Sequence, residues 1–147
     1  MKKPAYHYTE SGLRNLWLAN GFVWMNTGYG RALSIHNVEG LHKLIGSTLA
    51  IKSQLTGAEL RFLRKEMDLS QRGLGELLGV SDQAVAKWEK HGRLPKTADR
   101  MVRLIYLEHV SGNVPIRKTI ENIADSDRVT VEKIVVEESA KGWKLAA

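Results

Sequence analysis

The sequence predicts an α+β protein with a small N-terminal antiparallel sheet plus a helix, then a bundle of four to five helices, then a C-terminal strand segment. Three observations support this prediction. Strand-like runs in the first fifty residues are separated by Asn20-Gly21, a dipeptide typical of tight hairpins. Apolar residues recur at helical spacing between residues 57 and 109, and they alternate again, imperfectly, in residues 128–136.

The first fifty residues are expected to form a three-stranded meander followed by one helix. The expected strands are residues 13–18, 22–26 and 31–35, and Asn37 is placed to cap a helix that ends near residue 49. Residues 50–54 are the expected linker. Because so small a sheet leaves its edges exposed, residues 1–50 are a candidate unit for dimerisation or partner binding.

One helix is expected before residues 69–92 and one after them. Thr56 and Glu59 have the spacing of a capping box at the start of the earlier one. The chain breaks at Leu94-Pro95, and a longer helix follows from about Ala98 to His109, with Met101 among its expected core residues.

Between them, residues 69–92 have the pattern of a helix-turn-helix. Leu74, Leu77 and Leu78 define the expected buried side of a short first helix, in which Gly73 and Gly75 allow a neighbour to approach closely. The two helices of this motif cross at about 90–120°.

The turn and the second helix of the motif also have distinct signals. Gly79 can adopt the positive φ that the turn requires, and Ser81 is placed to cap the helix that follows. In that helix Val85 and Trp88 share one apolar stripe, so we expect Trp88 in the core rather than as a platform for stacking bases.

Residues 113–147 are expected to form a C-terminal helix and strand extension. Pro115 can begin a helix over residues 116–123, and Gly142-Trp143 suggests a turn and a final strand. Such a strand could add to the N-terminal sheet or exchange across a dimer. The predicted domains are therefore residues 1–50, 51–112 and 113–147, with the helix-turn-helix in the second.

Residues 55–109 resemble the Xre/Cro family of phage-type repressors. The resemblance rests on Gln71 at the start of the first motif helix, on Gly79-Val80-Ser81 at the turn and on Trp88-Glu89 at the end of the second helix. Within that family, residues 55–71 and 95–109 are most similar to the DNA-binding half of MqsA-like antitoxins and related proteobacterial regulators. The resemblance implies a phage-repressor-like fold and double-stranded DNA as a partner.

One departure from these antitoxins concerns their zinc-binding front half, which is built from paired cysteines. This chain has no cysteine, which excludes a structural zinc site of that type. The departure puts toxin neutralisation in doubt, because the front half of those relatives contacts the toxin. It leaves the DNA-binding interpretation intact.

Composition agrees with a DNA partner. The formal net charge is +6 and the isoelectric point is near 9.7, which favours a polyanion. The positive excess lies in residues 1–110, whereas residues 111–147 are balanced. No stretch of about 18 apolar residues is present and the N-terminus lacks a signal-peptide pattern, so we expect a soluble, cytoplasmic protein without a membrane partner.

The resemblance also implies which side chains face DNA. At the start of the second helix of the motif, Asp82, Gln83 and Lys87 are expected to face base edges, as cytosine, adenine and guanine readers respectively. A second group is expected on phosphates, with Gln71 reaching either a phosphate or a base. This group comprises Gln71, Arg72, Ser81, Lys90, Arg93 and Lys96.

Each of these candidates also has a purely structural interpretation. Ser81 can act as a helix cap alone, and Gln83 and Lys87 can be ordinary solvated residues. Asp82 is the odd member, because a carboxylate near phosphates is unfavourable unless it pairs with a base amine or a cation. Glu89 is expected to pair locally.

Enzymatic functions find little support. The spacing of His36, Glu39 and His42 could in principle hold a metal, but His36 precedes the expected helix and so leaves that face. No nucleophile elbow, phosphate loop or metalloprotease helix is present. We predict no catalysis, no metal and no cofactor.

Three functions remain, of which a metal-dependent enzyme rests on the histidine spacing alone and the other two are favoured. The first of these two is a sequence-specific transcriptional regulator, expected to be a repressor, that binds a pseudo-palindromic operator as a homodimer. The second is an antitoxin of a toxin–antitoxin pair, which would neutralise a toxin protein and repress its own operon.

Overall fold

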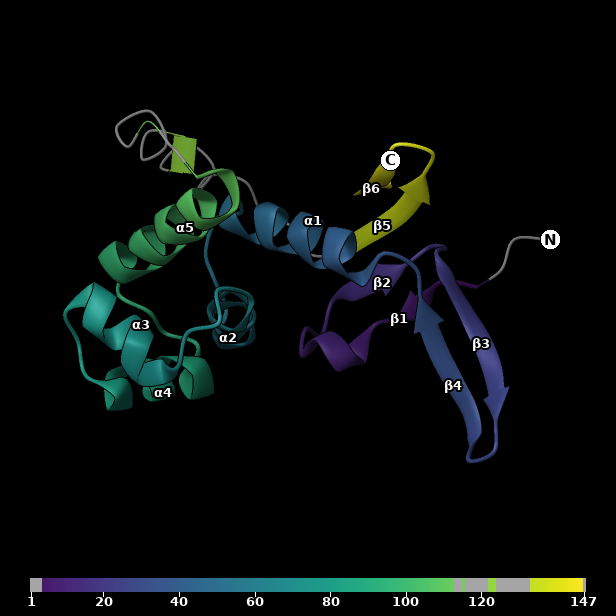
Figure 1. The fold of residues 1–147 in the computed structure, drawn as a ribbon. Helices are drawn as coiled ribbons and strands as arrows, with labels where there is room; N and C mark the ends of the chain where they lie inside the picture. Colours follow the sequence, from purple (N-terminus) through teal and green to yellow (C-terminus); the bar gives the residue numbers. More distant parts are fainter. Residues whose placement is uncertain (1–3, 113–114, 116–121, 124–132, 147) are drawn as a thin grey trace. The chain divides into compact units, whose positions relative to one another are not determined.

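The computed structural model describes residues 4–112, 115, 122–123 and 133–146. The protein is α+β, as predicted, and its contacts divide it into two compact units (Figure 1). One unit combines residues 1–44 with residues 132–147, and the other comprises residues 45–131. The division into domains at 1–50, 51–112 and 113–147 stays a prediction, because compactness does not test which segments fold independently.

The first unit contains a four-stranded sheet in the order β1-β2-β5-β6. Its strands are β1 (Tyr6–His7), β2 (Leu16–Leu18), β5 (Ile134–Ser139) and β6 (Gly142–Leu145). Strand β2 pairs antiparallel with β1 but parallel with β5, so that Leu16 lies opposite Ile134. The C-terminal strands therefore add to the N-terminal sheet, which was one of the two predicted alternatives.

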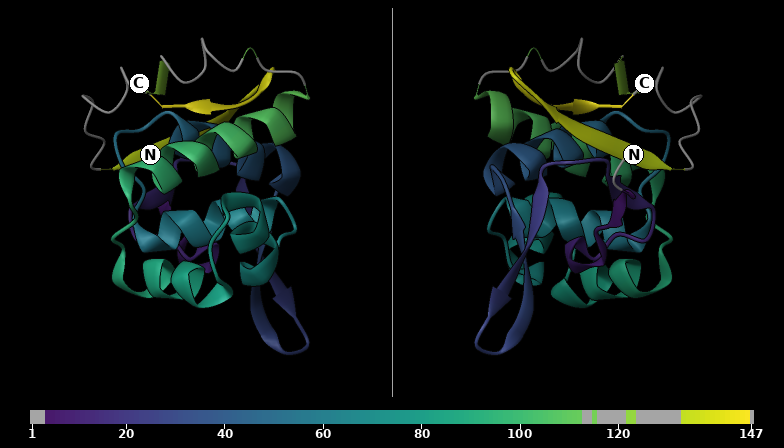
Figure 2. Two further views of the ribbon diagram at one scale, coloured as in Figure 1. Left: turned by 90° about the vertical axis from the view of Figure 1, so that its left-hand side faces the viewer. Right: turned by 90° about the vertical axis from the view of Figure 1, so that its right-hand side faces the viewer.

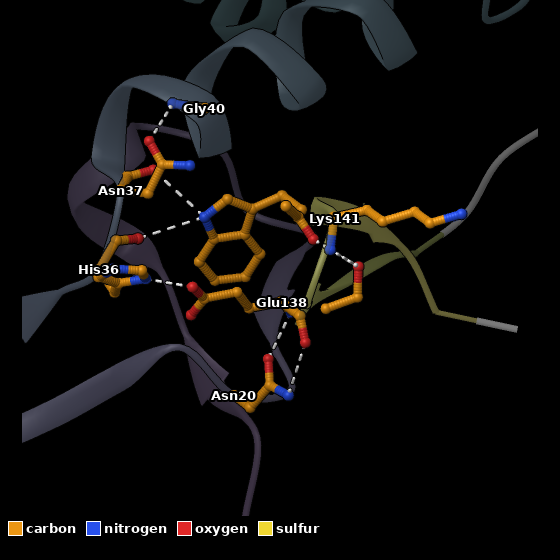
Figure 3. Close-up of polar contacts among 9 residues, drawn as sticks. Asn20, His36, Asn37, Gly40, Glu138 and Lys141 are labelled. Atoms are coloured by element: carbon orange, nitrogen blue, oxygen red, sulfur yellow. Dashed lines mark hydrogen bonds and ion pairs between the residues drawn. The ribbon is translucent and has the colours of Figure 1, made fainter.

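The other strands of this unit form a separate hairpin of β3 (Phe22–Thr27) and β4 (Gly30–Ile35). The prediction of one three-stranded meander is therefore wrong, because β2 pairs with β5 and not with β3. The side chain of Asn20 explains the difference. Its amide group both donates to the Glu138 carbonyl oxygen (3.3 Å) and accepts from the Glu138 amide (2.6 Å), so it prolongs the pairing of β2 with β5 (Figure 3).

Polar contacts around His36 join the hairpin and the start of helix α1 (Val38–Ala50) to the C-terminal strands (Figure 3). The His36 ring bonds to the Glu138 carboxylate, and the Trp143 indole donates to the carbonyl oxygens of His36 and Asn37, each at 3.2 Å. Asn37 caps helix α1 as predicted, because its side-chain oxygen accepts from the Gly40 amide.

A second group of rings in this unit lies near β1 and β2. The His7 ring stacks on Trp17 with 4.1 Å between centroids, and the Tyr8 hydroxyl bonds to His42 Nε2 at 2.8 Å. His36 and His42 thus have different partners. In the described part of the chain, no group of three histidine, aspartate or glutamate residues is arranged to hold a metal ion.

Helix α1 (Val38–Ala50) contains the boundary between the two units, and further helices follow in the described part of the second unit. These are α2 (Gly57–Glu66), α3 (Gln71–Leu78), α4 (Asp82–His91) and α5 (Lys96–Ser111), drawn from two further sides in Figure 2. Within the described residues, no helix is long and apolar enough to span a membrane. Residues 116–121 of the predicted 116–123 helix and residues 128–132 of the predicted 128–136 strand lie outside the described residues, whereas residues 122–123 are helical.

Two predicted core positions of this bundle are wrong. Leu77 is 56 % exposed and Met101 is 41 % exposed. In each helix the inward-facing stripe follows the i, i+3, i+4, i+7 pattern. It begins with a polar residue, which is the half-buried Gln71 in α3 and the buried Asp99 in α5. Counting apolar residues alone therefore shifted the stripe toward the wrong side of the helix.

A buried polar network closes the bundle between residue 52 and α5. Lys52 forms an ion pair with Glu59 (2.8 Å), and Asp99 forms one with Arg103 (2.6 Å). The Arg103 guanidinium also donates to the Lys52 carbonyl oxygen, and the Asp99 carboxylate accepts from the Leu55 amide at 2.8 Å. The loop before α2 is thereby fixed to α5, since unpaired charges at these positions would be costly.

Tyr106 should make the stability of the bundle depend on alkaline pH. Burial, with a smaller contribution from the charge of Glu66, raises the pKa of Tyr106 from 10.0 to about 12. The unfolded chain then loses this proton at a lower pH than the folded chain. Stability contributed by the neutral phenol is therefore complete below pH 10 and is lost as the pH rises toward 12, by about 3 kcal/mol.

Urea unfolding followed by circular dichroism between pH 8 and 12 measures this loss of stability. Tyr106→Phe should remove the part of the loss that comes from ionisation of the Tyr106 phenol. Tyr29→Phe is the matched control, because Tyr29 is fully exposed and should leave the pH profile unchanged. An equally steep profile in Tyr106→Phe and the natural protein would show that another group is responsible.

Candidate nucleic-acid interface

Helices α3 and α4 form a helix-turn-helix whose ends are fixed by local hydrogen bonds. The Ser81 hydroxyl caps α4 by accepting from the Ala84 amide at 3.1 Å, as predicted, and Ser70 caps α3 in the same way at 2.9 Å. Between the helices, Gly79 adopts φ 76° and ends α3 with its amide bonded to the Gly75 carbonyl oxygen. Thr56 and Glu59 form the predicted capping box at α2.

A buried ion pair between Arg64 of α2 and Glu89 of α4 positions the second helix of the motif. The guanidinium contacts the carboxylate twice, with Nε–Oε2 at 2.6 Å and Nη2–Oε1 at 3.1 Å. The two side chains are only 11 % and 7 % exposed. Glu89 was expected to pair locally, and that prediction is wrong because its partner lies 25 residues away.

The same pair also holds α3 and the loop before it. The Gln71 side-chain amide donates to Glu89 Oε1 at 3.2 Å, and Arg64 Nη1 donates to the Leu69 carbonyl oxygen at 3.0 Å. Arg64 was not among the residues predicted to form the site. Its i+4 relation to the buried Leu60 indicates the inward face and could have identified it.

The predicted base-reading residues lie together on the exposed side of α4. Asp82, Gln83 and Lys87 are all exposed, and Gln83 and Lys87 are one helical turn apart. Lys90 continues the same exposed face toward the end of the helix. Asp82 is in the first turn of α4, where its negative charge interacts favourably with the helix dipole.

The predicted phosphate contacts differ in how available they are. Arg72 is exposed but lies 3.5 Å from Glu76 one turn later, an exposed pair of little strength. Arg93 and Lys96 are exposed beyond the end of α4. Gln71 is half-buried, and one of its two amide hydrogens is used by Glu89, so a phosphate contact would have to use the other.

An open depression adjoins the C-terminal end of α4. It has a volume of about 820 Å³ and is lined by residues of α4 and of the following loop, namely Lys87, Trp88, His91, Arg93, Leu94 and Pro95. Trp88, which was expected in the core rather than as a stacking platform, is half-buried and also lines this depression. Its side chain forms part of a basic surface that continues the exposed face of α4.

The comparison with protein families identifies this region. Residues 60–100 match the helix-turn-helix family, which supports DNA binding and transcriptional regulation by an Xre-type domain. The match covers α2, α3, α4 and the start of α5. Neither the curated proteins nor the solved structures gave a significant match to the chain.

Removing one partner of the buried ion pair should destabilise the bundle more than removing both. Glu89→Ala leaves the Arg64 guanidinium buried without its partner, and such losses cost about 3–5 kcal/mol. Replacing both residues by methionine removes both charges and should cost less than Glu89→Ala alone. Urea unfolding of the two variants tests this, and an equal or larger cost for the double variant would contradict it.

Glycines 73 and 75 should respond oppositely to alanine. A Cβ at residue 75 would lie 2.6 Å from the Val80 carbonyl oxygen, so Gly75→Ala must displace the turn, at a cost of about 1–3 kcal/mol. A Cβ at residue 73 would meet the Ser70 hydroxyl at 3.2 Å and no other helix. Gly73→Ala is therefore the matched control, near neutral or stabilising by up to about 1 kcal/mol.

Thermal unfolding and DNA binding of both variants would measure the difference. Gly75→Ala should lower the melting temperature and weaken DNA binding together, since the displaced turn carries α4. Equal melting temperatures for the two variants would show that the turn yields without cost.

Proposed function

We propose that this protein is a sequence-specific transcriptional repressor that binds a pseudo-palindromic operator as a homodimer. The observation that carries the proposal is the exposed row of Asp82, Gln83 and Lys87 on a helix fixed by the Arg64–Glu89 pair. A reading helix needs side chains that point to solvent on a rigid backbone. In a two-fold dimer, the two copies of α4 would reach half-sites about one helical turn apart, roughly 34 Å.

We propose direct base contacts for three side chains at the start of α4. The Gln83 side chain can donate from its amide nitrogen to adenine N7 and accept from the adenine N6 amino group, the bidentate arrangement typical of this residue, and Lys87 can donate to guanine O6 or N7. Asp82 would accept from the amino group of cytosine. All three are exposed, so these contacts would require no rearrangement of the bundle.

Phosphate contacts would flank this row. Ser81 can cap α4 and still donate, because a hydroxyl that accepts from the Ala84 amide retains its own hydrogen for a phosphate oxygen. Arg72, Lys90 and Arg93 would supply charge, and Gln71 would contribute its remaining amide hydrogen. Sequence is not read by these contacts, which set affinity and its salt dependence.

An antitoxin is the second candidate. It is supported by the resemblance of residues 55–71 and 95–109 to MqsA-like antitoxins and by the presence of a compact unit besides the helix-turn-helix bundle. That unit would bind a toxin without zinc, since the stacking of His7 on Trp17 and the Tyr8–His42 bond tie its elements together. Co-purification with a small protein encoded beside it would support this function, and isolation of this chain alone would oppose it.

The primary proposal is tested by fluorescence anisotropy on the DNA upstream of the gene for this protein, with scrambled duplex as competitor. Gln83→Ala and Lys87→Ala together should weaken specific binding by at least about thirtyfold, because each base contact contributes about 1–3 kcal/mol of discrimination. Binding to the scrambled duplex should change much less. Titration from about 50 to 200 mM salt separates the electrostatic contribution.

Two single variants serve as controls. Lys90→Ala should weaken binding to both duplexes alike and reduce the salt slope by about 1, as expected for a phosphate contact. Lys65→Ala removes the same charge from the exposed side of α2, outside the proposed interface, and should change neither. Unaltered discrimination in the Gln83/Lys87 double variant would refute the assignment of the reading residues.

A further inference from the structure

The β3–β4 hairpin is a two-stranded ribbon that no third strand joins within the described residues. Its register runs from Phe22 opposite Ile35 to Thr27 opposite Gly30, with the turn at Gly28-Tyr29. In Figures 1 and 2 the ribbon extends beyond β1 and β2 as a narrow arm. Isolated two-stranded ribbons are only marginally stable in water, so this arm would gain from additional pairing.

The exposed side chains of β3 are apolar or uncharged. Five of its six residues are exposed, and Val23 and Met25 on one face are 60 % and 54 % exposed. On the other face Trp24 packs against Tyr6, with 5.7 Å between centroids. Natural proteins usually protect such edges with lysine, glutamate or proline, and β3 has none of these.

The register shows which backbone groups of β3 point outward. The His36 amide donates to the Gly21 carbonyl oxygen at 2.8 Å, and hydrogen-bonded pairs alternate along an antiparallel ladder. Residues 23 and 25 therefore bond to β4, whereas the amides and carbonyls of Trp24 and Asn26 point away from it. These outward groups are available to another strand.

Charge distinguishes the two edges of the ribbon. The outer edge of β4 includes Arg31, whose guanidinium lies 4.7 Å from the Trp24 ring centroid. Two copies meeting along β4 would bring two arginines near each other, whereas β3 contains no charged residue. Because the whole chain has a net charge of +6, two copies approach most easily where neither contributes charge.

We infer that two copies of this chain pair through the β3 edge, with residues 24–26 of each copy forming an antiparallel ladder across a two-fold axis. The two ribbons then make one four-stranded sheet, and the Val23–Met25 faces of both copies form one apolar surface. The inference deepens the proposed function, on which it rests for the two-fold operator. A strand edge buries less than the roughly 800 Å² per partner of standard interfaces, so the dimer should be reversible and stabilised by DNA.

Sedimentation equilibrium of the full chain tests the pairing with two variants. Asn26→Pro removes an outward amide, and proline is tolerated at edge positions, so the hairpin should persist while the dimer is lost. Met25→Lys should also abolish the dimer by placing like charges on facing strands. Ala32→Lys is the matched control, because Ala32 is the cross-strand partner of Met25 on β4 and should leave the dimer intact.

Cysteine cross-linking gives an independent result, because the natural chain contains no cysteine. Met25→Cys should cross-link between copies with a short bis-maleimide. Ala32→Cys should not, because the two copies of residue 32 would be separated by three strand spacings, about 14 Å. Cross-linking at residue 25 alone supports the inference, and equal cross-linking of both or of neither overturns it.

The two proposals can fail separately. If Asn26→Pro is monomeric but still binds a single half-site specifically, both proposals stand. If the natural chain is monomeric, or stays dimeric in both Asn26→Pro and Met25→Lys, the β3 interface is refuted while specific DNA binding can persist. If the natural chain shows no specific binding although the variants lose the dimer, the proposed function is refuted and the interface stands.

Discussion

The ion pair between Arg64 and Glu89 is the interaction on which the proposed reading surface depends. It joins α2 to α4, and through Gln71 and the Leu69 carbonyl oxygen it also holds α3 and the loop before it. Taking two charges out of water is costly, and the cost is offset only where the remaining donors and acceptors also find partners. Here the extra partners come from the helix-turn-helix itself, so the pair is satisfied only when α2, α3 and α4 are correctly arranged.

A single close approach then sets the angle between α3 and α4. Gly75 lies against the backbone of Val80 and Ser81, and Gly79 supplies the left-handed conformation at the turn. Any side chain at residue 75 would push the turn outward and carry the start of α4 with it. The row of Asp82, Gln83 and Lys87 is thus oriented by contacts on the opposite side of the motif, where none of these three residues takes part.

How far the sequence predicts this structure depends on the range of the interaction. The caps at Thr56 and Ser81 and the turn at Gly79 were predicted correctly, because each depends on residues within one helical turn. The pairing of β2 with β5 was not, since Asn20 bonds to Glu138 from 118 residues away and its Asn-Gly pattern equally suits a hairpin. Leu77 and Met101 were misplaced because buried polar residues complete their helical stripes.

The buried ion pairs of the bundle also determine where the positive charge of the protein can act. In the described part of the chain, each buried cation has a buried anionic partner: Lys52 with Glu59, Arg64 with Glu89, and Arg103 with Asp99. The three pairs are neutral, so the net charge of +6 belongs to the rest of the chain, where phosphates can reach it. Exposed cations attract any nucleic acid alike, in a salt-dependent manner. In the proposed function, discrimination between sequences therefore comes from the few polar side chains that the buried pairs hold in place on α4.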